Sequence, residues 1–513
     1  MTRTVRVTAD GVPLATDVVL PPSGPAEGPY PAVVIRTPYG RRAHRGEARA
    51  WAARGFAAIV QDVRGRYGSG GRWRPYAYEA ADGAATLRWI RERPWSDGRI
   101  VAAGSSYAAY CALVTVLGDP GDPGGSAAPP DAVAVAVPAL GTAETARDPS
   151  GVERLLGRAG WWAAHGDRAD SDPEALDRRL GHDPDLLRHL PVAELPVRLG
   201  RALPSWPGIW CSPRADLVVR RAPGARTPLL AIGGTHDPFA ADTLALWRAW
   251  GGPARLVLGP WGHRLTRDPG PGARPEHRID LGALTVAWAR AVCAGRPPAG
   301  RSGAVAVAGT PYWYPATAVT DTPARRIPLT GGPFDGALLY GGDFRADPEH
   351  PVRSDDLRAD PGRADRALFV TGPLPHDTHL VGPATAELRV TADTPAADWF
   401  VRIVAVDPSG RAEPVAVGSA RTARPPGTWS TVTVPLGPLA RRIPRGTRLR
   451  TEIAGHHFPA HARNPHTGQD PVTATRLRPS GRALRADDCA LLLPVARPRP
   501  DGARPDLSEE IPA

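Results

Sequence analysis

Short apolar runs alternate with stretches of helical spacing along residues 1–110. Runs of strand type occur at 4–8, 15–20, 32–35, 56–60 and 99–103, and helical spacing occurs at 43–54 and 78–93. Buried strands that alternate with helices form a mainly parallel sheet that is covered on both faces. Residues 1–110 therefore predict the first part of an α/β core.

The pattern changes twice further along the chain. Residues 111–225 are rich in Arg, Asp, Pro and Trp and predict short helices and loops, which we interpret as a helical cap inserted into the core. Strand and helix signals return at 226–300, the second part of the core. From 301 to 513, short alternating strands recur between Pro and Gly turns, which predicts an all-β sandwich domain.

The charge of the chain does not indicate a nucleic-acid partner. The formal net charge is +11, and all 63 basic residues are arginines. They are scattered, with no long basic run and no interleaved aromatic residues. Nucleic-acid binding surfaces show the opposite, a clustered basic patch, so we interpret the arginines as part of a compositional bias.

Several features that the sequence lacks bear on where the protein acts and on which cofactors it could bind. No segment approaches the ~18 apolar residues that a membrane span needs, and residues 1–20 alternate like strands instead of forming an apolar leader. The four cysteines form no Cys-x-x-Cys pair, which argues against a zinc site and a disulfide framework. We therefore expect a cytoplasmic protein with no membrane contact, no metal and no cofactor.

A strand-to-helix junction carries the first candidate catalytic residue. Ser106 follows a buried strand, with Gly104 before it and Ala108 and Ala109 after it. A nucleophile elbow holds its serine on a strained turn, which requires small residues at these positions. Ser105 fits less well, because larger neighbours would occupy those places. The second glycine of Gly-x-Ser-x-Gly is absent, and a serine that only caps the helix is the alternative interpretation.

Two later loops supply partners for this serine. Asp237 follows the strand at 228–232, and His263 follows the strand at 255–258. A serine hydroxyl needs an imidazole as its base, and the imidazole needs a carboxylate to orient it; in α/β-hydrolases they occur in the order Ser, Asp, His. His236 is the competing base, but it directly precedes Asp237, and adjacent residues of an extended loop point apart.

At these residues the chain resembles the cocaine-esterase family of X-Pro dipeptidyl-peptidase-like serine hydrolases, a group that includes glutaryl acylases and α-amino-acid ester hydrolases. The resemblance covers roughly 1–110 and 226–495, whereas 111–225 matches poorly. The matching segments are Asp10-Gly11-Val12, Arg36-Thr37-Pro38-Tyr39, Gln61-Asp62-Val63-Arg64-Gly65, Ser69-Gly70-Gly71, Glu79-Ala80-Ala81-Asp82-Gly83, Trp89-Ile90, Pro94-Trp95-Ser96-Asp97-Gly98, Gly104-Ser105-Ser106-Tyr107, Gly259-Pro260-Trp261-Gly262-His263, Phe458-Pro459 and Arg463-Asn464-Pro465.

The resemblance implies an α/β-hydrolase core with a helical cap and a C-terminal jelly-roll β-sandwich. It assigns Ser106 as nucleophile, Asp237 as the orienting carboxylate and His263 as base. It also assigns the oxyanion hole to the Tyr39 hydroxyl and the Tyr107 backbone N–H. A side-chain donor agrees with the absence of a His-Gly-Gly-Gly loop, since an oxyanion needs two donors aimed at one point. The alternative for Tyr39 is a purely structural packing role.

Aromatic residues and one charged pair complete the expected site. The candidate walls of an acyl pocket, each of which could instead be ordinary core, are Phe239, Trp161, Trp162 and Phe458. Asp62 and Arg64 are expected to form a buried structural ion pair instead of a catalytic one.

Together these residues predict a serine hydrolase that cleaves small carboxylic esters or amides through an acyl-enzyme. We favour an esterase over an X-Pro dipeptidyl-peptidase, because such a peptidase needs carboxylates that hold the substrate amine. The cap acids Glu144, Asp148 and Asp167 form no evident cluster. A biosynthetic acyltransferase with the same triad and a non-catalytic scaffold remain open alternatives. The sequence determines neither the acyl group, nor the leaving group, nor whether the chain forms a homo-oligomer.

Overall fold

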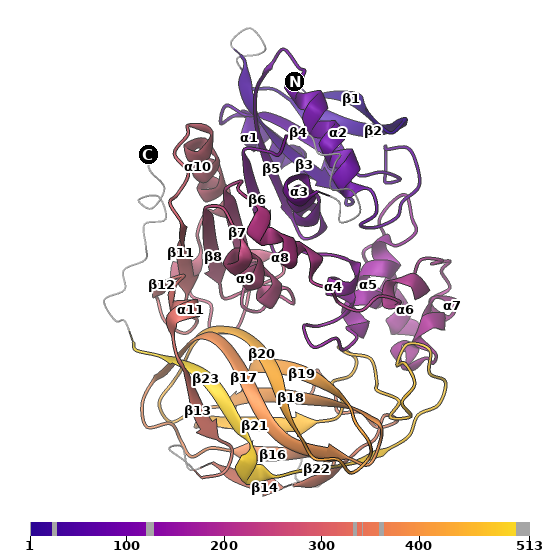
Figure 1. The fold of residues 1–513 in the computed structure, drawn as a ribbon, viewed down its shortest axis with the longest axis vertical. Coiled ribbons are helices and arrows are strands. Elements are labelled where there is room, and N and C mark those ends of the chain that lie inside the picture. Colours follow the sequence, from indigo (N-terminus) through magenta and orange to yellow (C-terminus); the bar gives the residue numbers. More distant parts are fainter. Residues whose placement is uncertain are drawn as a thin grey trace.

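The computed structural model describes residues 2–22, 28–118, 128–331, 336–340, 342–358 and 364–498. Three parts are visible in Figure 1: a core of strands and helices, a group of short helices beside it, and a β-sandwich that contacts both. No helix in the described ranges has the length and apolar character needed to cross a membrane.

The core is built on a ten-stranded sheet. Its order is β1-β2-β4-β3-β5-β6-β7-β8-β11-β12. The strands from β4 through β11 in this order are parallel, whereas β1, β2 and β12 are antiparallel to their neighbours. Their bounds are β1 (Thr2–Ala9), β2 (Val12–Val19), β3 (Tyr30–Thr37), β4 (Ala57–Asp62), β5 (Ser96–Ser105), β6 (Ala132–Ala136), β7 (Leu229–Gly234), β8 (Ala254–Gly259), β11 (Arg301–Ala306) and β12 (Trp313–Pro315).

Helices cover both faces of this sheet because its strands are apolar on both sides. Ala32 and Val34 of β3 join one hydrophobic cluster, while Val33 and Ile35 join the cluster on the opposite face. The helices that pack in the first cluster are α2 (Glu79–Arg91), α3 (Tyr107–Leu117), α8 (Leu217–Arg221) and α9 (Ala240–Ala249). Those that pack in the second are α1 (Arg45–Ala52) and α10 (Leu281–Cys293).

The sheet extends beyond the boundaries expected at 110 and 300. β6 lies inside the segment 111–225, yet it fills the position between β5 and β7. Its sequence is a run of five small residues, too short to stand out in Pro-rich surroundings, and a central strand is stabilised by pairing on both edges. β11 and β12 follow residue 300 and complete the far edge of the sheet. The sandwich therefore begins after α11 (Ala318–Asp321).

The cap is a group of short helices that follows β6. Its α-helices are α4 (Thr142–Ala146), α5 (Leu155–His165), α6 (Ala175–His182) and α7 (Leu195–Leu199). It has its own apolar cluster, which includes Leu155, Trp162 and Trp206. A hairpin formed by β9 (Trp261–Gly262) and β10 (Leu265–Pro269) lies next in the chain after β8.

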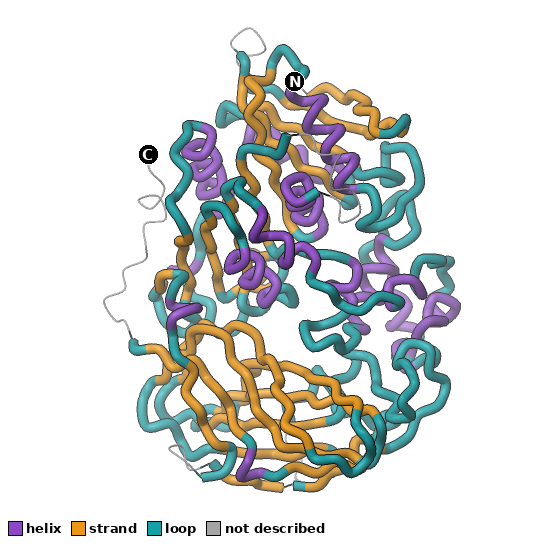
Figure 2. Tube along the Cα trace, in the orientation of Figure 1, coloured by secondary structure: helices purple, strands orange, loops and turns teal. Residues whose placement is uncertain are grey.

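The C-terminal domain consists of two antiparallel sheets that enclose a separate core (Figure 2). Strands β13, β23, β17, β22 and β15 are neighbours in one sheet, in which β20 also pairs with β17; the other has the order β14-β16-β21-β18-β19. The bounds are β13 (Ala324–Pro328), β14 (Ala337–Tyr340), β15 (Asp343–Ala346), β16 (Arg366–Val370), β17 (Thr378–Ala392), β18 (Ala396–Val406), β19 (Ala412–Ala423), β20 (Ser430–Ile443), β21 (Arg448–Ala454), β22 (Ser480–Leu484) and β23 (Ala490–Ala496).

The segment between β21 and β22 ties the sandwich to the cap. The backbone N–H of Leu155 donates to the Ala460 carbonyl at 2.9 Å, and that of Ala193 donates to the Val472 carbonyl at 2.9 Å. Phe458, from the same segment, is buried in the apolar cluster of the cap. In Figure 1 this yellow segment reaches up to α5, α6 and α7.

Candidate active site

Ser106 occupies the turn between β5 and α3 in a strained backbone conformation. Its φ and ψ angles are 56° and −120°, and its backbone N–H donates to the Ala136 carbonyl at 2.9 Å. A residue with a side chain rarely adopts a positive φ, and such strain concentrates at functional turns. The turn therefore has the geometry of a nucleophile elbow, with Ser106 at the carboxyl end of a central parallel strand.

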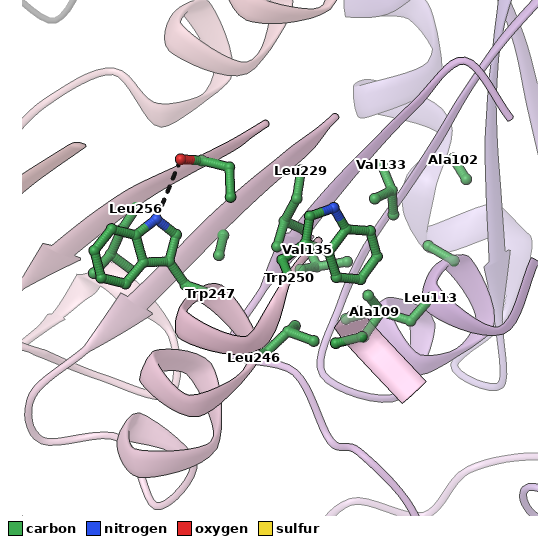
Figure 3. Packing of buried hydrophobic residues seen from close by; sticks show 14 of the residues in the cluster. Ala102, Ala109, Leu113, Val133, Val135, Leu229, Leu246, Trp247, Trp250 and Leu256 are labelled. Carbon is green, nitrogen blue, oxygen red and sulfur yellow. Dashed lines mark hydrogen bonds between the residues drawn. The ribbon is translucent and has the colours of Figure 1, made fainter. Parts of the chain in front are cut away.

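Ala109 stands three residues after Ser106, where the family that the chain resembles usually has glycine, and it is part of the core. Its side chain is fully buried. Figure 3 shows Ala109 and Leu113 of α3 among Val133 and Leu229 of the neighbouring strands. A methyl group at position 109 therefore fits between helix and strand without separating them.

Ser106, His263 and Asp237 form one hydrogen-bonded chain. His263 Nε2 lies 3.1 Å from Ser106 Oγ, and His263 Nδ1 lies 2.6 Å from Asp237 Oδ1. Asp237 follows β7, and its second oxygen, Oδ2, accepts the backbone N–H of Phe239 at 3.1 Å. Asp237 is buried, whereas the His263 side chain is 39% exposed, so the imidazole can be reached from outside.

His236, the competing base, lies elsewhere. Its backbone N–H donates to the Trp261 carbonyl at 3.0 Å, and its ring packs against Gly270, where an added Cβ would come within 2.1 Å of it. Burial lowers the pKa of His236, and the charged groups near it include Arg441 and Glu413 of the sandwich.

Tyr39 and Tyr107 are the two candidate donors to the oxyanion. The Tyr39 hydroxyl lies 3.4 Å from Ser106 Oγ and accepts a hydrogen bond from Trp161 Nε1 at 3.3 Å. Tyr107 is the first residue of α3, and a backbone N–H in the first turn of a helix has no acceptor within the helix. The Tyr39 hydroxyl is thus next to the serine oxygen, and the Tyr107 N–H belongs to the residue that directly follows the serine.

The side chain of Tyr107 is held in place by hydrogen bonds. Its hydroxyl donates a short hydrogen bond to Glu79 and accepts the backbone N–H of Tyr76 at 2.6 Å. Burial raises the pKa of the Glu79 carboxyl and holds the pKa of the Tyr107 hydroxyl well above its usual value. This anchoring fixes the backbone of the residue that follows Ser106.

The four candidate pocket aromatics separate into two pairs. Phe239 packs edge-on against His263, with ring centroids 5.5 Å apart, and Trp161 stacks on Tyr107 at 6.0 Å. Trp162 points the other way, into the cap cluster that also contains Phe458, and its Nε1 donates to Ser205 Oγ at 2.9 Å. Trp162 also lines a hollow of about 590 Å³. Only Phe239 and Trp161 thus contact residues of the site itself.

Each acidic cap residue singled out in the sequence has a structural partner. Glu144 Oε1 accepts the Asp216 N–H at 2.9 Å, and Asp167 Oδ2 accepts the Ser205 N–H at 3.0 Å. Asp148 accepts the backbone N–H of Ser150 at 2.9 Å. In the described ranges, no group of three or more His, Cys, Asp or Glu side chains could hold a metal ion.

The expected ion pair between Asp62 and Arg64 is wrong. Asp62 accepts the Arg41 N–H at 2.6 Å and pairs with the Arg41 guanidinium, whereas Arg64 Nε donates to Asp82 at 3.1 Å. Asp62 and Arg64 each bond to a residue from another segment of the chain. Two residues that are two positions apart after a strand need not bond to each other.

Sequence reasoning missed two arginines of the cap, Arg154 directly before helix α5 and Arg158 within it. Arg154 lies over the ring of Phe239, with Cζ 5.9 Å from its centroid, and Arg158 lies over Trp161 at 5.6 Å. The spacing of the residues along the sequence could have indicated them, because Arg154, Arg158, Trp161 and His165 recur at helical intervals and so share one face.

Comparison with solved structures defines the class. An α-amino acid ester hydrolase superimposes with a TM-score of 0.75 at 17% identity, and the match covers 97% of this chain and 96% of that chain. An aminopeptidase from the marine sediment archaeon Thaumarchaeota archaeon superimposes with a TM-score of 0.72 at 18% identity, with the same coverage of both chains. These similarities establish an α/β-hydrolase core joined to an antiparallel β domain.

Comparison of sequences defines the family. The model of the X-Pro dipeptidyl-peptidase (S15 family) matches residues 10–264, and that of the X-Pro dipeptidyl-peptidase C-terminal non-catalytic domain matches residues 304–488. The cocaine esterase of Rhodococcus sp. (strain MB1 Bresler) is 25% identical, over 90% of this chain and 91% of that protein. The chain belongs to the cocaine-esterase and X-Pro dipeptidyl-peptidase-like family, and it is a serine hydrolase.

Proposed function

We propose that the protein hydrolyses carboxylic esters through an acyl-enzyme formed on Ser106. The observation that supports this most strongly is the continuous chain from Ser106 Oγ through His263 to Asp237, with gaps of 3.1 and 2.6 Å. A serine at a strained elbow with an imidazole and a buried carboxylate in line is the arrangement of a nucleophile, its base and the group that orients the base.

The proposed reaction has two halves. Ser106 Oγ attacks the substrate carbonyl while its proton passes to His263 Nε2, and the negative charge on the carbonyl oxygen accepts hydrogen bonds from the Tyr39 hydroxyl and the Tyr107 N–H. The tetrahedral species collapses, and His263 gives the proton to the departing alcohol. Water then attacks the acyl-enzyme with His263 again as base, which releases the acid and restores Ser106.

An ester is a better candidate substrate than an X-Pro peptide, because the acidic side chains of the cap already accept hydrogen bonds from the chain itself. Glu144, Asp148 and Asp167 each accept backbone N–H groups, so none of them is arranged as a receptor for a substrate amine. We further propose that the enzyme acts in the cytoplasm, which agrees with its four unpaired cysteine thiols.

Labelling with a fluorophosphonate tests the proposal. Intact-mass measurement should show one adduct on the wild-type chain and none on Ser106→Ala, while the matched control Ser105→Ala should keep full labelling. Adduct that disappears with Ser105→Ala and persists in Ser106→Ala would refute the assignment of the nucleophile. A folded wild-type chain that takes up no label would refute the proposed activity.

A further inference from the structure

One face of α5 covers the candidate active site. Arg154 precedes the helix directly, and Arg158, Trp161 and His165 follow at intervals of four, three and four residues, which places all four on one side. Trp161 hydrogen-bonds the Tyr39 hydroxyl, and the His165 ring lies 5.1 Å from that of Tyr39. The two arginines therefore belong to the same surface that faces the serine.

Arg154 places a partly buried cationic group beside the triad. Its Cζ lies 5.9 Å from the Phe239 ring, which itself packs against His263. Its Nη1 atom is buried and has no hydrogen-bond partner in the described part of the chain. Burial lowers the pKa of this guanidinium, although Asp237 and Asp242 favour its charged form.

Arg158 holds a second such group one helical turn away. Its side chain is buried, with only 7% exposed, and its Nη1 donates to Thr145 Oγ1 at 3.0 Å. Burial also lowers the pKa of Arg158, and the charge of Arg154 adds to the effect. Among the residues that the structure describes, no carboxylate forms an ion pair with either arginine.

The nearest acids are committed to other groups. Asp237 is engaged by His263 and the Phe239 N–H, and Asp242 is paired with Arg214. Asp148 is bonded to Ser150, Ser419 and His461. Two like charges that are wholly or partly removed from water without a counter-ion are unfavourable, so this arrangement is suited to an anion that arrives from outside.

We propose that Arg154 and Arg158 form an anion subsite, and that the natural substrate is an ester or amide that carries a carboxylate. This inference rests on the proposed function and names its substrate class. Guanidinium groups bind carboxylates through paired N–H donors, which gives orientation as well as attraction. The same two charges repel an ammonium group, so the selectivity should be opposite to that required for an amino acid ester.

Matched substrates test this selectivity. The mono-4-nitrophenyl ester of adipic acid is compared with its methyl ester, which is neutral, and with 4-nitrophenyl 6-aminohexanoate, which is cationic. We expect kcat/KM to fall at least about tenfold from the carboxylate to the neutral ester and further to the ammonium ester. A second arm uses hexanoate esters of 4-hydroxybenzoate and of its methyl ester, which places the carboxylate on the leaving group.

Variants assign the effect to the two arginines. Arg154→Gln and Arg158→Gln should each lower the ratio of kcat/KM between carboxylate and neutral ester by about tenfold or more, and Arg154→Lys should retain part of it. Arg220→Gln, an exposed arginine on α8, is the matched control and should leave the ratio unchanged. Circular dichroism and thermal melts confirm that each variant is folded.

The outcomes separate this inference from the proposed function. A preference for the carboxylate in either arm supports the subsite and shows which part of the substrate occupies it. Ratios within about twofold in both arms, in an enzyme that hydrolyses the neutral ester, would overturn the subsite while the proposed function stands. If no ester is hydrolysed, the binding of adipate to Ser106→Ala is measured by calorimetric titration. Binding that is lost when Arg154→Gln is added supports the subsite, and the absence of binding refutes it.

Discussion

A Cβ atom built on Gly104 would lie 2.3 Å from the Ala108 carbonyl oxygen, so strand β5 and helix α3 approach each other at this glycine as closely as their backbones allow. The contact lies directly behind Ser106 and fixes the angle at which the elbow presents its serine. The atom it would meet belongs to the backbone and cannot rotate away.

Gly104→Ala should therefore displace Ser106 and lower kcat/KM by at least about 100-fold, since a displacement of about 1 Å at a reacting group has an effect of that size. Ala109→Gly is the companion variant. It should lose about 0.5–1 kcal/mol of stability, as expected for glycine inside a helix, and keep most of its activity. Assays on an activated ester, with denaturation curves for both variants, check the pair. Full activity in folded Gly104→Ala would contradict the steric role of this glycine.

Tyr39→Phe should lower kcat and leave KM nearly unchanged, because the Tyr39 hydroxyl would donate to the oxyanion only in the transition state. Removal of one such donor costs about 2.7–4 kcal/mol, or about 100–1,000-fold in rate. Steady-state kinetics on a 4-nitrophenyl ester measure both constants. A loss below about threefold in a folded variant would exclude Tyr39 from this role.

Much of this site could be predicted from local sequence. The buried runs that became β3, β4 and β5 are apolar on both faces, and Ser106, Asp237 and His263 each follow a strand in the order this fold uses. Each of these signals is local, because it consists of one strand and the few residues after it. The structure places all three side chains at the same edge of the sheet.

The rest depended on contacts between distant segments. Arg154 and Arg158 would ordinarily mark a solvent-exposed surface, and only the packing of this segment against the core places them over Phe239 and Trp161. Trp161 and Trp162 are adjacent in sequence but point about 100° apart around the helix, so only one of them faces the site. The sequence pattern groups β11 and β12 with the sandwich, because their place in the core sheet depends on the pairing of β11 with β8 and of β12 with β11.

The stability of the fold should decrease as pH falls below about 6.5, the value of an unperturbed histidine. Burial lowers the pKa of His165 to about 4, of His457 to about 3 and of His466 to about 4. The unfolded chain therefore binds more protons than the folded chain in this window, and each proton contributes about 1.4 kcal/mol per pH unit. The contribution is fully present above about pH 6.5 and is lost as pH falls toward the folded pKa values.

The variant His457→Phe tests how much one of these histidines contributes to the pH dependence of stability. The free energy of unfolding, measured in urea from pH 7.5 to 5, should depend less steeply on pH in this variant than in the wild type. The comparison between the two proteins is needed because burial raises the pKa of Glu79 and Asp242, which act with the opposite sign. An identical dependence on pH in both proteins would show that His457 is not kept neutral by folding.

Truncation should show that the sandwich is part of the enzyme. A chain that ends at residue 322 keeps β11 and β12 but loses Val381 and Ala440 from the core cluster and Phe458 from the cap cluster. The exposed apolar faces should leave it insoluble or inactive. Phe458→Ala in the full chain should lower the free energy of unfolding by about 3–5 kcal/mol. A soluble 1–322 fragment with near-full esterase activity would instead identify the sandwich as an appendage.

The acyl-enzyme itself can be observed. The protein is mixed with a 4-nitrophenyl ester, quenched with acid within the first turnover, and digested for peptide mass spectrometry with fragmentation between Ser105 and Ser106. The expected result is the mass of the acyl group on Ser106, formed in step with a burst of nitrophenol and absent from Ser106→Ala. An acyl group located on Ser105, or steady turnover of the ester with no covalent adduct on the chain, would contradict the proposed mechanism.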